Sequence, residues 1–177
     1  MKRTVLPIGI DNFSTLVRGT DSKGNHYLFL DKSLLIQEII DNGAMVTLIT
    51  RPRRFGKTLN LSMLQYFFSK EVNGVATEGL FTGLKVADHP EVMTYQGQSP
   101  VLFITLKDIK GNTFEAMLGM LKSELVGLCK AHEYLLDSIK VRDWQKVVFE
   151  SFLTESAKPA AYKRAFQFLC ELLYQHR

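Results

Sequence analysis

The stretch Met45-Val46-Thr47-Leu48-Ile49-Thr50-Arg51-Pro52-Arg53-Arg54-Phe55-Gly56-Lys57-Thr58 decides the expected fold of this chain. Residues 45–50 are apolar or β-branched, which is typical of a buried strand. Beyond the basic loop that follows, apolar residues recur at helical spacing from Leu59 to about Lys70. We therefore predict the local order strand, basic loop, helix.

Further strands and helices are predicted on both sides of this stretch. A second strand is expected over 101–106 and a shorter one over 27–30. A helix is expected over 34–42, capped by Asp31 or Ser33 and stopped by Gly43, and others over about 113–130, 133–154 and 159–176. Because buried strands alternate with helices, we predict an α/β fold with a mainly parallel sheet flanked by helices and a helical C-terminal part.

The predicted strands are few for such a sheet, and a sheet of two or three strands leaves its edges exposed. We therefore expect one incomplete domain over residues 1–177, the front part of a longer protein. Within it, 1–43 form an N-terminal lead and helix, 44–110 the core around the basic loop, and 111–177 the helical part.

The composition is that of a folded, non-membrane protein. Of the 177 residues, 46% are hydrophobic and 23% are charged, close to the averages of globular domains. No stretch approaches the roughly 18 apolar residues of a membrane helix, and no signal peptide is recognised, so we expect a cytoplasmic protein without membrane partners. Cys129 and Cys170 lack metal-ligand spacing and are interpreted as small buried apolar residues rather than a disulfide or metal site.

The positive charge of the chain is local. The net charge of +4 comes from 22 basic and 18 acidic residues, and Arg51, Arg53, Arg54 and Lys57 account for the whole excess. A local basic cluster of this kind suits a phosphate or another polyanion.

The second half of the loop matches the phosphate-binding loop (P-loop, Walker A motif). Gly56 allows close backbone approach to a phosphate, Lys57 reaches the terminal phosphates, and the Thr58 hydroxyl is a ligand for Mg²⁺. The strict pattern also requires glycine five positions before Gly56, where Arg51 stands, held toward an extended conformation by Pro52. Arg53 and Arg54 can supply planar, charge-assisted hydrogen bonds to phosphate oxygens. The competing interpretation is that they are solvated loop charges before an ordinary helix start.

Hydrolysis requires a further acidic group that this chain does not clearly offer. A metal-binding carboxylate is expected after a second strand, but no apolar run ends in Asp-Glu or Asp-Asp. Asp108, just past the 101–106 strand, is a weak substitute and is more typical of a turn or cap. The four histidines are scattered and suggest no catalyst.

These residues resemble the AAA-ATPase-like family, which is related to the wider P-loop AAA+ and STAND groups. The matching segments are Leu6-Pro7-Ile8-Gly9 with Phe13, Phe29-Leu30-Asp31-Lys32-Ser33, Ile49 through Leu64, and Pro100 through Asp108. Arg51-Pro52-Arg53-Arg54-Phe55-Gly56-Lys57-Thr58 is this family's own form of the phosphate loop.

The resemblance implies a P-loop NTPase-like fold that binds ATP and Mg²⁺. The resemblance assigns metal ligation to Thr58. It assigns nucleotide binding to Arg53, Arg54, Phe55, Gly56, Lys57, Thr58 and Leu59. Family members usually continue to an acidic strand, and a PD-(D/E)XK nuclease-like domain that would contact nucleic acid often follows; neither occurs in these residues. ATPase activity would therefore need residues or a partner that complete the site.

Three functional hypotheses follow. The first is an ATP-binding P-loop module. The second is a non-enzymatic module that grips nucleic-acid phosphates through the Arg51–Lys57 loop, and the third is an inert, truncated remnant. The sequence leaves the oligomeric state open.

Overall fold

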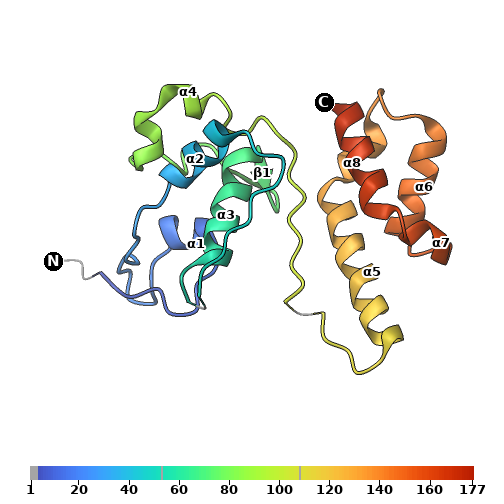
Figure 1. Ribbon diagram of the computed structural model, residues 1–177, viewed down its shortest axis with the longest axis horizontal. Coiled ribbons are helices and arrows are strands. Elements are labelled where there is room, and N and C mark those ends of the chain that lie inside the picture. Colours follow the sequence, from blue (N-terminus) through green and yellow to red (C-terminus); the bar gives the residue numbers. More distant parts are fainter. Residues whose placement is uncertain (1–3, 53, 108) are drawn as a thin grey trace. The chain divides into compact units, whose positions relative to one another are not determined.

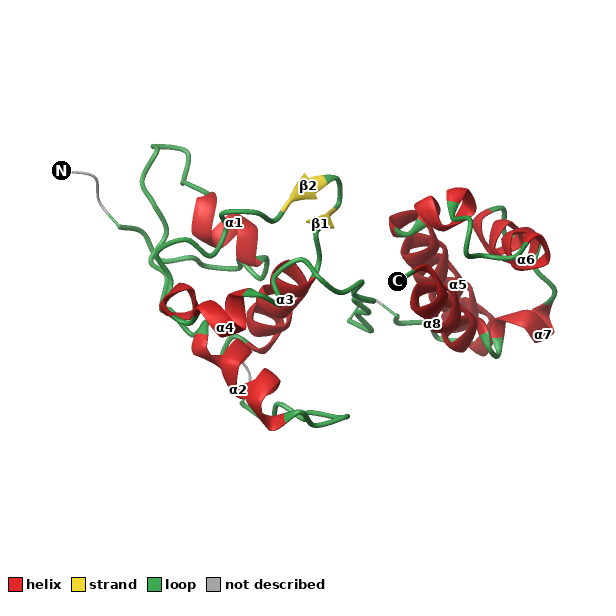
Figure 2. Ribbon diagram, turned by 90° about the horizontal axis from the view of Figure 1, so that it is seen from above, coloured by secondary structure: helices red, strands yellow, loops and turns green. Residues whose placement is uncertain are grey.

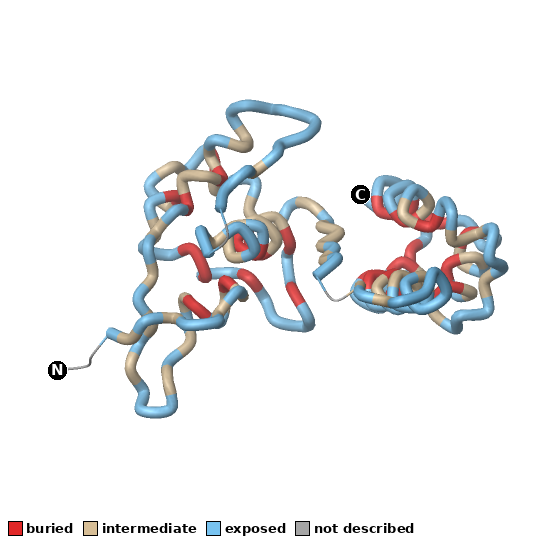
Figure 3. Tube along the Cα trace, turned by 60° about the horizontal axis from the view of Figure 1, so that its bottom comes forward, coloured by how far each residue is buried: buried red, intermediate tan, exposed pale blue. Residues whose placement is uncertain are grey.

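The structure is a computed structural model that describes residues 4–52, 54–107 and 109–177. The chain divides into two compact units, Met1–Val101 and Leu102–Arg177. Each unit has its own cluster of buried residues (Figure 3). The units are described separately below.

The first unit consists of short helices around an aromatic core (Figure 1). Its elements are α1 (Phe13–Arg18), α2 (Leu34–Asn42), α3 (Lys57–Phe68), the hairpin β1 (Glu71–Val72) and β2 (Val75–Ala76), the 3₁₀ helix η1 (Lys85–Asp88) and α4 (Pro90–Met93). Phe81 stacks on Phe13 with ring centroids 5.0 Å apart and meets Phe67 edge-on at 5.1 Å. Rings from α1, from α3 and from the segment after the hairpin are thereby buried together, and offset or edge-on pairs of this kind add to the burial energy.

Helix ends in this unit follow the local sequence signals. The Asn12 side chain caps α1 by accepting a hydrogen bond from the Thr15 N–H at 3.0 Å. The predicted helix over 34–42 is confirmed as α2, which ends at Gly43 in the left-handed conformation. Ser33 occupies the N-cap position of α2, but its hydroxyl makes no capping bond.

The regular elements described in the second unit are all helices (Figure 2). Its elements are α5 (Phe114–Ala131), the 3₁₀ helix η2 (Glu133–Asp137), α6 (Asp143–Leu153), α7 (Pro159–Tyr162) and α8 (Ala165–His176). Thr113 caps α5, at the start of the helix predicted over about 113–130, and Pro159 begins α7. The helices predicted over 133–154 and 159–176 are each divided into two elements. The core lies among α5, α6 and α8, with Cys129, Phe149 and Leu172 fully buried.

The predicted α/β fold with a mainly parallel sheet is wrong. Within the described residues the sheet consists of β1 and β2 alone, an antiparallel pair with Val72 opposite Val75 (Figure 2). Residues 45–50 and 101–106 belong to no strand. Residues 27–30 form no strand either, since Tyr27 makes only an isolated bridge to Val5.

The physical reason is that an apolar, β-branched run favours extended backbone but cannot supply its own hydrogen-bonding partner. Met45, Val46 and Leu48 are accordingly exposed rather than buried. No described helix is both long and apolar enough to cross a membrane.

Candidate functional site

A hydrogen bond joins the two ends of the basic loop at the start of α3. Lys57 is the first residue of this helix, and its Nζ donates a 2.7 Å hydrogen bond to the carbonyl oxygen of Arg51. The lysine side chain therefore folds back over the loop that precedes it. Its ammonium group lies where the chain enters the loop, at the position that an anion cradled by the loop would also approach.

The turn into α3 depends on two residues with left-handed backbone. Gly56, the N-cap, has φ 74° and ψ 25°, and Arg54 has φ 68°. Glycine adopts this conformation freely, whereas for arginine it costs roughly 1 kcal/mol. Arg51 is absent from the described residues with positive φ, so this position lacks the left-handed backbone that the glycine of the strict motif allows.

The N-terminus of α3 offers free donors. The first intrahelical bond joins the Asn60 N–H to the Gly56 carbonyl at 2.9 Å, so the N–H groups of Lys57, Thr58 and Leu59 point out of the helix end. No side chain caps this end. The Thr58 side chain is exposed in the same turn. Free N–H groups, the helix dipole and a hydroxyl together form a site suited to an anion with its cation.

A pocket of about 340 Å³ opens beside the loop. Its walls come from the lead (Leu6 and Pro7), from the segment 28–32, and from the loop with the start of α3 (54–63), and they are mostly apolar. Among the described lining residues, the charged ones are Lys32 and Arg54. An apolar cavity with cations at one side fits a flat organic group attached to a polyanion.

Lys32 reaches the loop from a different element. Its Nζ lies 3.9 Å from the point that a Cβ on Gly56 would occupy, with no other described atom outside the immediate chain within 4 Å of that point. The space in front of Gly56 is therefore open, and two ammonium groups, Lys32 and Lys57, stand at the same loop. These residues fit a bound phosphate chain.

Asp31 and Ser33 hold the backbone on both sides of Lys32. Asp31 accepts hydrogen bonds from the N–H of Ser33 at 2.8 Å and of Lys85 at 2.7 Å, and the buried Ser33 hydroxyl accepts one from the Val86 N–H at 3.0 Å. Partial burial raises the pKa of Asp31, but the hydrogen bonds from Ser33 and Lys85 outweigh it and lower that pKa below its ordinary value. Asp31 was expected to cap α2; it instead ties the start of this helix to η1.

The structure brings most of the predicted site residues together. Arg54, Phe55, Gly56 and Leu59 line the pocket, and Lys57 and Thr58 lie at the helix start beside it. Arg53 and Asp108, proposed as a phosphate ligand and as a weak metal ligand, lie outside the described residues. No group of three or more His, Cys, Asp or Glu side chains that could hold a metal occurs in the described part of the chain. Of the two predicted metal ligands, Thr58 is the one that lies within the described residues.

The sequence predicted nucleotide binding by Phe55 and Leu59, but it predicted no ligand role for Lys32 or for the pocket walls formed by Leu6, Pro7 and residues 28–30. A signal for them existed. The segments Leu6-Pro7-Ile8-Gly9 and Phe29-Leu30-Asp31-Lys32-Ser33 were both part of the family resemblance, and both contribute to the pocket. Their joint proximity to the loop is a tertiary contact that no local pattern contains.

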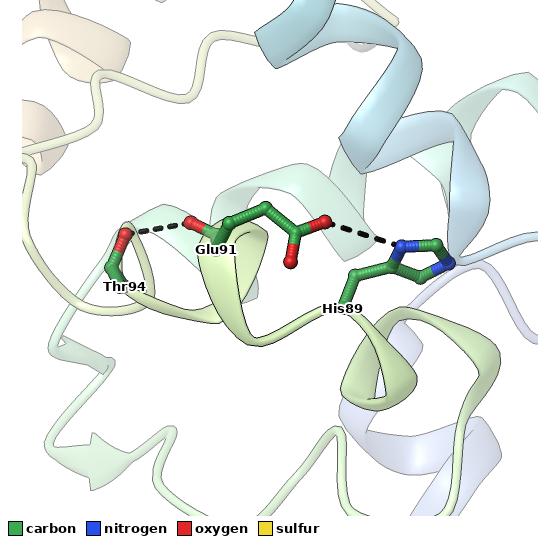
Figure 4. Close-up of polar contacts among 3 residues, drawn as sticks. All are labelled: His89, Glu91 and Thr94. Carbon is green, nitrogen blue, oxygen red and sulfur yellow. Dashed lines mark hydrogen bonds and ion pairs between the residues drawn. The ribbon is translucent and has the colours of Figure 1, made fainter.

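Other polar side-chain contacts involve histidine residues. At α4, His89 Nδ1 lies 3.3 Å from Glu91 Oε1, and the Thr94 hydroxyl donates a 2.7 Å hydrogen bond to the Glu91 carbonyl (Figure 4). In the second unit, His176 Nδ1 lies 2.9 Å from the Ser138 hydroxyl. These contacts join residues at the ends of short elements.

A family model described as "Predicted AAA-ATPase" matches residues 7–168, and the chain belongs to this AAA-ATPase-like family. It is also 36% identical over 105 residues to a protein of Azotobacter chroococcum mcd 1 described as "Uncharacterized protein in vnfD 5'region". That match covers 59% of this chain and 17% of the relative, so the chain spans a small part of the relative's length. No solved structure matches the chain.

Proposed function

We propose that the first unit, Met1–Val101, binds a nucleoside triphosphate, with ATP and Mg²⁺ as its ligands. The observation that carries this proposal is the loop around Gly56, in which Lys57 folds back to the Arg51 carbonyl while the first N–H groups of α3 remain free. The membership in a predicted ATPase family supports the same function.

The phosphates would lie at the helix start. Lys57 would exchange its bond to the Arg51 carbonyl for a charge-assisted bond to a phosphate oxygen, and the N–H groups of α3 would donate to the same chain of phosphates. Arg54 lines the pocket and adds positive charge beside them. The Thr58 hydroxyl would ligate Mg²⁺, whose preferred ligands are oxygens.

The nucleotide base would occupy the apolar pocket. Leu6, Pro7, Phe55 and Leu59 line it, and aromatic and aliphatic walls favour a planar base. The preference for adenine follows from the family alone. Hydrolysis would require an acidic metal ligand, which the described residues of this unit do not place at the loop, so binding is the proposed activity.

The test is the melting temperature of the purified chain with and without Mg-ATP. Ligand at about a hundred times its dissociation constant should add roughly 2.7 kcal/mol of stability, a shift of about 2–4 °C for each kcal/mol. Lys57→Ala should abolish the shift, because it removes the cation at the loop. Lys23→Ala is the matched control, since Lys23 is an exposed lysine of the same unit in the turn 21–25.

Two results would contradict the proposal. One is a wild-type chain that melts cooperatively but shows no shift with Mg-ATP. The other is a shift that survives in Lys57→Ala. Stabilisation by single-stranded DNA that falls steeply with salt, without any by ATP, would instead support the nucleic-acid-binding hypothesis for the Arg51–Lys57 loop.

A further inference from the structure

The position of Lys32 carries an inference that goes beyond the phosphate-loop motif. Its side chain is exposed and lines the pocket together with Arg54 and Gly56. Its Nζ lies 3.9 Å from where a Cβ on Gly56 would be. No described residue forms an ion pair or hydrogen bond with this ammonium group. A lysine whose ammonium group forms no ion pair within the described residues leaves its charge available to a ligand.

The backbone that carries Lys32 is fixed on both sides. Asp31 binds the N–H groups of Ser33 and Lys85, and the Ser33 hydroxyl, which is fully buried, binds the Val86 N–H. These bonds anchor the start of α2 to η1, more than 50 residues away in sequence. The Cα of Lys32 is therefore positioned by tertiary contacts, which reduces the entropy lost when the side chain engages a ligand.

The charges around the pocket favour an anion. Within the described part of the chain, its lining contains Lys32 and Arg54 and no carboxylate. Lys57 already approaches the loop from the α3 side and bonds to Arg51, whereas Lys32 approaches Gly56 from the start of α2. The two lysines thus reach the same loop from two different elements.

We propose that Lys32 is a second lysine, besides Lys57, that binds the phosphates of the nucleotide at Gly56. This inference rests on the proposed function, since it concerns the same phosphate chain. Lys32 donates charge-assisted hydrogen bonds to phosphate oxygens. Asp31 and Ser33 act as positioning residues, because they hold the segment that carries Lys32 without contacting the ligand themselves.

The experiment measures the affinities of Mg-ATP and of inorganic tripolyphosphate by titration calorimetry. It compares the wild-type chain with Lys32→Gln, Lys57→Ala and the control Lys23→Gln. Lys32→Gln should weaken both ligands by at least about tenfold, the loss expected for a hydrogen bond to a charged group. Lys23→Gln, which removes an exposed lysine of the same unit, should bind both ligands as the wild type does. Lys32→Arg, which retains the charge, should recover most of the affinity.

The outcomes separate this inference from the proposed function. If the wild-type chain binds neither ligand, both fail. If the wild-type chain binds ATP and Lys57→Ala does not, but Lys32→Gln binds with wild-type affinity, the role of Lys32 alone is overturned. A Lys32→Gln variant that melts far below the wild type without ligand would also overturn it, because Lys32 would then support the fold rather than the phosphates.

Discussion

The buried hydroxyl of Ser62 accepts a hydrogen bond from the backbone N–H of Phe13 at 3.0 Å. This bond joins the first residue of α1 to the middle of α3, two segments separated by 49 residues. One turn further along α3, the Tyr66 hydroxyl accepts a 3.1 Å bond from the Asn12 side chain. These two bonds dock the start of α1, whose Phe13 lines the pocket, on the helix that begins at the basic loop.

Replacing Ser62 by alanine should destabilise the chain by about 1–3 kcal/mol, because the buried Phe13 N–H would lose its acceptor. The measurement is urea unfolding followed by far-UV circular dichroism. Ser123→Ala is the control, since Ser123 is exposed on α5 and its hydroxyl bonds only to the Gly119 carbonyl. Equal stabilities of the two variants would show that the Phe13–Ser62 bond contributes nothing.

Alanine at Gly56 and at Gly119 should change stability in opposite directions. Gly56 has φ 74°, so Gly56→Ala should cost about 1–2 kcal/mol through backbone strain rather than a clash. Gly119 lies inside α5 with open space at its Cβ position, and Gly119→Ala should stabilise by up to about 1 kcal/mol through helix propensity. Unfolding free energies of both variants check the prediction, and a stabilising Gly56→Ala would contradict the left-handed turn.

The stability supplied by Asp31 should depend on pH. Its pKa is lowered in the folded chain relative to the ordinary value of 3.8, so the folded state binds fewer protons than the unfolded state near that pH. The contribution of the Asp31 carboxylate to the free energy of unfolding is therefore complete above about pH 3.8. It is lost as the pH falls through the lower pKa of the folded state. At neutral pH, Asp31→Asn should destabilise by about 1 kcal/mol, because a charged acceptor of two backbone N–H groups is lost.

The check is a series of melting temperatures for wild type and Asp31→Asn from neutral pH downward. The difference between them should shrink as the pH drops below about 3.8. Glu38→Gln removes an exposed carboxylate from α2 and should follow the wild type at neutral pH. A difference that stays constant through the acid range would rule out the proposed role of the Asp31 carboxylate.

The two cysteines should react with thiol reagents at very different rates. Cys129 is 1% exposed, and burial raises its pKa to about 11, whereas Cys170 is exposed. Because the thiolate is the reactive form, a chromogenic disulfide should label one thiol rapidly at mildly alkaline pH and the second only after unfolding. Cys170→Ser should remove the rapid phase. A rapid phase that persists in this variant would show that Cys129 is accessible.

The local signals predicted the helices better than the sheet. The apolar stripe with Gly43 predicted α2, and Thr113 predicted the start of α5, because capping and helical periodicity are interactions between residues close in sequence. The run Met45–Thr50 carried an equally strong strand signal and still forms no strand. A strand requires a partner from elsewhere in the chain, and its own residues do not specify one.

The sequence by itself determined that a basic loop containing Gly56 and Lys57 precedes an apolar helix, since both features depend on neighbouring residues. Only the tertiary structure decided that Lys32 lies at Gly56, that the lead and residues 28–32 close a pocket beside the loop, and that Ser62 binds Phe13. These contacts join residues tens of positions apart. These contacts form because the aromatic core around Phe13, Phe67 and Phe81 brings together the segments on which the contacting residues lie. A pattern of neighbouring residues does not encode that packing.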